Sequence, residues 1–463
     1  MRSQWFLCAL VLVPAATSPT VAQPPREPKD GKLIVPLVVS AVPVPVPALK
    51  YQLLPDLRDL KPGNQVPAFS KCFMEQHAFY REKESVNQRE KWAVAPLAGL
   101  AGVKELVDYG GSSARQADYA ARLDMVDWAI LDQLKTQGPT LLLPDVQQLR
   151  GLAQVLRVKM RSEIARKDYP TALRTAQTMF ALARSLNEHP TLIGQLIGVA
   201  ITTITLGVVE ELVAQPDAPN LFWALTDLPT PFIDMRKGMQ GERALVGADF
   251  DVLRKANPIP EAERNRLVKK LDSFGLTVLD GSKKLLPSAW YAEQVADPAK
   301  VAAAKTRLAT LYGHPVADLD KLAALQIVMM DDYAWHEVYR DDLMKWTQLP
   351  ARQLPTEEYM APHGAFSELP PGVRKVLQAR DRCQQHIALL TAVEAVRAYA
   401  AKNGGKLPPA LEAIELPVPV DPFTGKAFVY ERKDATAIIR ATPPPDRKSE
   451  PAHNRVYEVT IRK

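Results

Sequence analysis

The stretch 141–186, LLLPDVQQLRGLAQVLRVKMRSEIARKDYPTALRTAQTMFALARSL, decides the fold. Apolar residues recur in it every three or four positions, which is the spacing that places side chains on one face of an α-helix. Asp145 stands where a helix N-cap is expected. The apolar face of the first predicted helix consists of Leu149, Leu152, Val155, Leu156, Met160 and Ile164.

The turn DYPTAL at 168–173 resembles the D-Y-x-x-A-L turn between the two helices of a tetratricopeptide repeat. In such a turn Tyr169 fills the space between the helices, and Ala172 allows them to approach closely. No second clean copy of the repeat follows. The resemblance therefore implies a tetratricopeptide-like stack of helical hairpins over residues 66–346, not a regular array.

Other segments extend this mainly α prediction. The spacing of Tyr119, Leu123, Val126, Ile130 and Leu134 predicts one helix across 110–138, which Gly138-Pro139 would end. A long amphipathic helix is predicted near 315–346. The tryptophans lie among aliphatic residues at helical spacing, which favours core packing over a carbohydrate platform; they are Trp92, Trp128, Trp223, Trp290, Trp335 and Trp346.

Residues 191–209 carry no charge over a length close to a bilayer span. Gly194 and Gly198 have the spacing of a membrane dimerisation motif. Against a span, the segment contains Gln195 and four threonines and runs directly into Glu210-Glu211. We interpret it as a buried helix of a soluble bundle, with a membrane span as the alternative.

The overall composition is that of a folded protein of two or three domains. The chain has 463 residues, of which 47% are hydrophobic and 24% are charged. Its net charge of +6 is mild for this length, and the Lys and Arg residues form no basic stripe. Nucleic acid is therefore not an expected partner.

The N-terminus has the pattern of a secretory signal peptide. Arg2 precedes an apolar run, Trp5–Ala16, that is too short to cross a bilayer. Thr20-Val21-Ala22 offers a cleavage site before Gln23. We expect residues 1–22 to be removed and the protein to lie in the periplasm or outside the cell, with a retained signal anchor as the alternative.

Export leaves two cysteines, Cys72 and Cys383. They either pair in a disulfide or are two small buried thiols, because sequence gives no distance between them. Neither has the CxxC or Cys/His spacing of a zinc or redox site. The Pro-rich residues 23–65 are predicted to be a leader with a short strand, which packs on the domain or tethers it.

The C-terminal part has a different design. A helix to about Ala401 is followed by the glycines of 403–405, and the stretch LPVPVDPFTGKAFVYE at 416–431 enters a hairpin. This layout resembles the C-terminal part of type II secretion pseudopilins, with Asp421-Pro422 at the turn. The resemblance implies a small α+β module over 372–463, after a Pro-rich linker at 347–371.

Known catalytic motifs are absent from the sequence: there is no GxSxG elbow, HExxH or phosphate-binding loop. The best cluster is MMDDYAWHEVYRDD, in which Asp332, His336 and Arg340 share a helix face. Asp332 and His336 could bind a metal or act as an oriented base. The alternative is an ordinary exposed, salt-bridged helix face with the histidine in solvent. We predict no cofactor.

From about Leu53 to its end the chain also resembles a family of uncharacterised exported proteins from planctomycete bacteria. The resemblance is carried by HPTLIGQLIGVAI at 189–201, QPDAPNLFWALTDLP at 215–229 and the stretch around Asp421. It implies export but no known activity.

Three hypotheses of function follow. The first is a non-catalytic scaffold or a protein- or peptide-binding protein of the cell envelope, with the binding surface on the helical stack. The second is a metal-assisted or acid/base hydrolase that uses Asp332 and His336. The third is an accessory component of a secretion system, acting through the pseudopilin-like tail.

Overall fold

The computed structural model describes residues 28–74, 76–245, 247–280, 283–354, 364–369 and 372–462. The predicted signal segment 1–22 lies outside these residues. The described chain is mainly helical with a small sheet part, as predicted. Its longer helices are α3 (Lys83–Val94), α5 (Gly111–Ala120), α7 (Pro144–Ala165), α8 (Tyr169–Ser185), α9 (Leu192–Val213), α11 (Arg236–Leu245), α13 (Glu261–Ser273), α14 (Pro287–Val295), α15 (Pro298–Thr310), α17 (Ala324–Met344) and α18 (Val373–Lys402).

The predicted hairpin at 141–186 is present as α7 and α8. Asp168 caps α8 by accepting a hydrogen bond from the Thr171 amide at 3.2 Å, while Tyr169 and Ala172 are buried at the turn. Asp145 does not cap α7: Pro144 occupies the first turn and places Asp145 inside the helix. Helix α9 packs against both α7 and α8, so the three helices form one layered core.

Helix α9 contains the uncharged segment 191–209. By length and composition it is the one described helix that could cross a membrane. In the structure it is largely buried among α7, α8, α11 and α18. Its hydroxyl groups are satisfied within the helix, because Thr202, Thr203 and Thr205 donate to carbonyls four residues earlier at 2.8–2.9 Å. The hydroxyl groups of these three threonines therefore need no hydrogen bonds to water.

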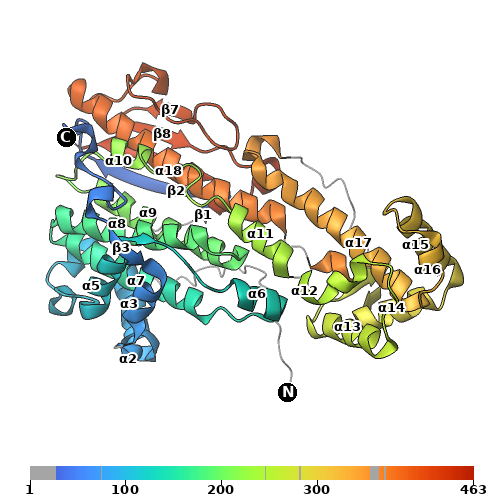
Figure 1. The fold of residues 1–463 in the computed structure, drawn as a ribbon. Coiled ribbons are helices and arrows are strands. Elements are labelled where there is room, and N and C mark those ends of the chain that lie inside the picture. Colours follow the sequence, from blue (N-terminus) through green and yellow to red (C-terminus); the bar gives the residue numbers. More distant parts are fainter. Residues whose placement is uncertain are drawn as a thin grey trace.

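A five-stranded sheet joins the two ends of the chain (Figure 1). Its order is β1 (Pro28–Lys29), β2 (Lys32–Val39), β9 (Arg455–Ile461), β8 (Thr436–Arg440) and β7 (Val429–Lys433). Strand β2 runs parallel to β9 from Leu33 opposite Arg455 to Val39 opposite Ile461, and the other pairs are antiparallel. Part of the predicted leader is thus a strand of the C-terminal sheet.

The C-terminal part of the chain contains a long helix, a turn and three strands of the sheet. Helix α18 ends at Lys402, before Gly404 and Gly405, which have positive φ. Asp421 is fully buried and forms the predicted turn: its carboxylate accepts from the amides of Phe423 and Thr442 at 2.9 and 2.8 Å. Helix α18 then contacts α9 and the strands β8 and β9.

A second apolar core lies at the other end of the molecule, and its buried members come from the described residues between Phe250 and Phe366 (Figure 1). It is built from α13, α14, α15, α17, the short helices α12 (Gly247–Phe250) and α16 (Val316–Leu319), and a hairpin of β5 (Val278–Asp280) and β6 (Lys283–Leu285). Ala365 and Phe366, which fall in the predicted linker, are fully buried in this core. The sequence range 66–346, predicted as one domain, therefore contributes to this core, to the core of α7 to α9, and to a smaller cluster around Tyr109.

The single helix predicted over 110–138 is wrong. The structure has α5, the strand β4 (Leu123–Met125) and α6 (Leu131–Gln137) instead. Strand β4 pairs in parallel with β3 (Lys61–Asn64), and the Gly63 amide donates to the Asp124 carboxylate at 3.0 Å. The long-range pairing interrupts the helix that local spacing favoured. The remaining short helices are α1 (Gln65–Ser70), α2 (His77–Arg81), α4 (Leu97–Leu100) and α10 (Phe222–Thr226).

A buried ion pair on α18 connects three distant parts of the chain. The Arg397 guanidinium binds Glu394 at 2.7 Å, and both side chains are fully buried. Arg397 also donates to the carbonyls of Ser40 at 3.0 Å and Ala218 at 2.8 Å, and Glu394 accepts from the Leu221 amide at 3.0 Å. The segment after β2, the loop before α10 and α18 are thus held at one point.

We expect Arg397→Met to lower the free energy of unfolding by about 3–5 kcal/mol, because it leaves the Glu394 carboxylate buried without its partner. Lys402→Met is the control on the same helix; it removes an exposed ion pair with Glu415 and should cost less than about 1 kcal/mol. Urea unfolding of each variant measures both values. Equal losses in the two variants would contradict the role given to Arg397.

Candidate functional site

The predicted pair Asp332 and His336 lies on the buried face of α17. Each side chain is only 1% exposed. One oxygen of Asp332 accepts hydrogen bonds from the Tyr291 hydroxyl at 2.5 Å and from the Ala365 amide at 3.0 Å. The prediction of an exposed, solvated helix face is therefore wrong, because α14 and the segment 364–369 cover it.

Gly364 closes the site around Asp332. It has a φ of +79°, and a Cβ atom at this position would come within 2.1 Å of the second Asp332 oxygen. Only glycine allows the backbone to approach the carboxyl group so closely. Burial raises the pKa of Asp332 to about 7, against the hydrogen bonds that favour its ionised form.

His336 lies against aromatic rings. Its ring stacks on Tyr333 at a centroid distance of 6.2 Å and is 5.9 Å from the Phe366 ring. Burial, and then the positive charge of Arg340, lower the pKa of His336 to about 4. The imidazole is therefore neutral at pH 7.

The geometry does not combine Asp332 and His336 into a catalytic pair. Within the described residues no hydrogen bond joins them. The described part of the chain also contains no group of three His, Cys, Asp or Glu side chains that could hold a metal ion. The two residues share a helix face, as predicted, and each is packed separately.

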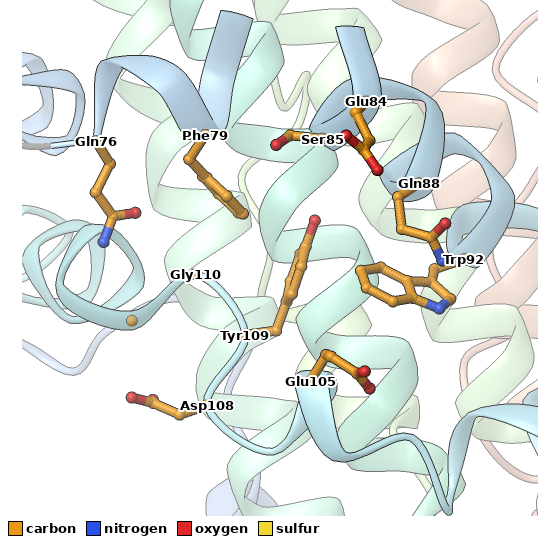
Figure 2. Close-up of a pocket in the computed structure, with 11 residues that line it drawn as sticks. Gln76, Phe79, Glu84, Ser85, Gln88, Trp92, Glu105, Asp108, Tyr109 and Gly110 are labelled. Carbon is orange, nitrogen blue, oxygen red and sulfur yellow. The ribbon is translucent and has the colours of Figure 1, made fainter. Parts of the chain in front are cut away.

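The structure also contains a groove that was not predicted from the sequence. Figure 2 shows it between α2–α3 and the segment 104–111. Its volume is about 570 Å³, which is within the range of ligand sites. Tyr109 lies between Phe79 and Trp92, with ring centroids 5.5 Å away in each case. The other lining residues are Gln76, Glu84, Ser85, Gln88, Glu105, Asp108, Gly110 and Gly111.

The sequence carried a signal for this groove that the periodicity argument missed. Trp92 was assigned to the core, but it is only partly buried and its ring faces the groove. Tyr109 belongs to no long amphipathic helix, so spacing gave it no role. Phe79 and Trp92 lie thirteen positions apart in a stretch rich in Glu, Lys and Arg, a composition that is unusual for a core segment.

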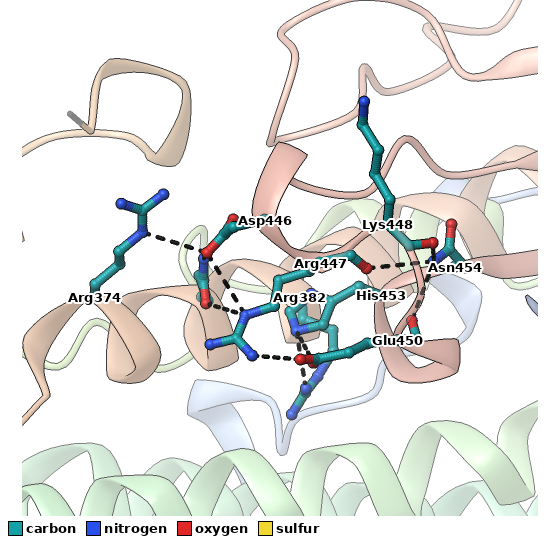
Figure 3. A network of polar contacts seen from close by, with 9 residues as sticks. Arg374, Arg382, Asp446, Arg447, Lys448, Glu450, His453 and Asn454 are labelled. Carbon is teal, nitrogen blue, oxygen red and sulfur yellow. Dashed lines mark hydrogen bonds and ion pairs between the residues drawn. The ribbon is translucent and has the colours of Figure 1, made fainter. Parts of the chain in front are cut away.

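A third group of polar side chains stabilises the contact between α18 and the segment before β9. Figure 3 shows α18 tied to the segment before β9. Asp446 accepts from Gln378 at 3.0 Å and pairs with Arg374 at 3.6 Å, and Arg382 lies 3.4 Å from the His453 ring. Burial lowers the pKa of His453 to about 4, so this ring is neutral beside the arginine at pH 7. The contacts fix the entry of β9 into the sheet.

No protein-family model, no curated protein and no solved structure matches this chain.

Asp332→Asn tests the buried carboxyl. The folded pKa of Asp332 lies above its unfolded value, so its contribution to stability is complete below about pH 4 and is lost as the pH rises through 7. Asparagine resembles the neutral carboxyl and has no such loss. We expect the stability of the variant relative to the wild type to rise by about 4 kcal/mol from pH 4 to pH 8.

Thermal or urea unfolding across this pH range measures the difference. Asp318→Asn, at a half-exposed carboxyl on α16 that is paired with Lys321, is the control and should change by less than about 1 kcal/mol. A flat difference for Asp332→Asn would show that the carboxyl is ionised at no cost in the folded protein.

Cys72 and Cys383 are both buried and free in the structure, so the two buried thiols are the arrangement found. Burial raises the pKa of each thiol to about 12. We expect neither to react with a thiol reagent at pH 8 in the folded protein, and both to react after unfolding without reductant. A mass loss of two hydrogens, with no titratable thiol in the unfolded mature chain, would instead demonstrate a disulfide.

Proposed function

We propose that this chain is an exported, non-catalytic scaffold that binds a protein or peptide partner in the cell envelope. In this proposal residues 1–22 are the signal peptide, and the helices of 66–346 stack in the manner of tetratricopeptide hairpins. The groove beside α3 is the binding surface, and the C-terminal α+β module anchors the stack.

The observation that supports the proposal is the groove lined by Phe79, Trp92 and Tyr109. Aromatic side chains give large contact areas at low entropic cost and are enriched at the centres of protein interfaces. The groove also contains amide and hydroxyl groups, from Gln76, Ser85 and Gln88, that can bind a peptide backbone.

The hydrolase hypothesis has less support. A hydrolytic site needs a nucleophile or activated water beside an oriented base, in a place that substrate can reach. Asp332 and His336 are buried and not hydrogen-bonded to each other.

The secretion hypothesis also has less support. Strand β7 lies at the outer edge of the sheet and ends in Glu431, Arg432 and Lys433. Charged residues at an edge disfavour the strand pairing that a secretion component could use.

Ser85→Trp tests the proposal. Ser85 lines the groove from α3, so the indole would fill the space that a partner needs. We expect peptides selected from a random displayed library on residues 23–463 to bind the variant at least about tenfold more weakly, by fluorescence anisotropy.

The matched control is Asn87→Trp, which adds the same side chain at an exposed position of α3 outside the groove. It should leave the affinity unchanged. A library that yields no binding peptide, or peptides that bind both variants equally, would count against the groove as a binding surface.

A further inference from the structure

The charged side chains that line the groove are all negative. Three carboxylates line it, those of Glu84, Glu105 and Asp108, and no Lys or Arg does. Asp108 is paired with Arg115 at 2.8 Å. Within the described residues Glu84 and Glu105 form no ion pair, and both are exposed. Figure 2 shows them on opposite sides of the Tyr109 and Trp92 rings.

The aromatic rings complement this charge. The face of an aromatic ring carries negative electrostatic potential and attracts a cation placed over it, most strongly for tryptophan. Trp92 and Tyr109 both line the groove and are nearly perpendicular, with an interplanar angle of 86°. Carboxylates beside such rings add a longer-range attraction for the same cation.

A buried cation already contacts two residues of the groove lining: the Arg89 guanidinium lies over the Phe79 ring, and its Nε donates to the Tyr109 hydroxyl at 3.4 Å. The Arg89 guanidinium lies 4.9 Å from the centroid of the Phe79 ring and donates to the Phe79 carbonyl at 2.5 Å. Arg89 is buried and does not line the groove. Asp108 is already paired with Arg115, so among the described residues Glu84 and Glu105 are the two lining carboxylates left to pair with a ligand.

We propose that the groove binds a basic side chain, lysine or arginine, of a peptide partner. This inference rests on the proposed function and specifies the chemistry of its ligand. The ammonium or guanidinium group lies against Trp92 and Tyr109 between Glu84 and Glu105. The remaining volume holds the flanking residues of the peptide, whose backbone reaches the amide groups of Gln76 and Gln88.

The test uses residues 23–463 and three labelled peptides of the form GGXGG, with X as arginine, lysine or glutamate. We expect the arginine and lysine peptides to bind at least about tenfold more tightly than the glutamate peptide. The double variant Glu84→Gln/Glu105→Gln keeps the volume of both side chains and should remove most of this preference. Raising the salt from 0.05 to 0.5 M should weaken wild-type binding in the same direction.

The matched control is Glu82→Gln/Glu90→Gln. It makes the same change in net charge at two exposed positions of the same region that do not line the groove. It should keep the preference for basic peptides. Equal loss in the two double variants would assign the effect to overall charge and overturn the inference.

The outcomes separate the inference from the function on which it rests. If library peptides bind and Ser85→Trp weakens them, but acidic and basic peptides bind alike, the cation inference fails and the peptide-binding function stands. If n-butylguanidinium alone competes as strongly as the arginine peptide, the groove binds small organic cations, and the proposal that the cation belongs to a peptide is overturned. If no library peptide binds, the proposed function fails as well.

Discussion

The buried ion pair of Glu394 and Arg397 is the constraint on which the rest of the arrangement depends. A guanidinium group with no exposure must find acceptors for all its N–H groups inside the protein. Arg397 finds them on Glu394 and on carbonyls of residues 40, 218 and 219. Because the three carbonyls lie more than 170 positions from Arg397 in sequence, one side chain fixes the segment after β2, the loop before α10 and helix α18 together.

A second buried arginine, Arg161, connects the central core to the helix that lines the groove. Arg161 on α7 binds Glu211 on α9 at 2.7 Å and donates to the carbonyls of Trp92 and Ala95, where α3 ends. The C-terminal turn of α3 is therefore attached to the central core through a charged contact. The back of the groove packs on Val155 and Val158 of α7. Its aromatic rings are held on a rigid support, which reduces the entropy lost when a ligand binds.

The sequence predicted local features well and long-range ones poorly. The α7–α8 hairpin, the end of α18 and the Asp421 turn follow from spacing, glycines and an Asp-Pro pair, all of which act within a few residues. Strand β4 was missed because its partner lies sixty residues away. The face shared by Asp332 and His336 was predicted correctly. Its burial was not, because the covering residues 364–366 and Tyr291 lie on other elements. The groove was missed because its rings come from two segments that the fold brings together.

The pairing of β2 with β9 makes the sheet depend on two segments that are far apart in sequence. Leu33 lies opposite Arg455, a separation of 422 positions. The helices α7 to α9 can pack without this pairing, because their contacts are more local in sequence. Strand β9 lies between β2 and β8, so its removal would separate β1 and β2 from β7 and β8. A change confined to 455–461 would thus divide the sheet and leave the contacts among α7, α8 and α9 in place.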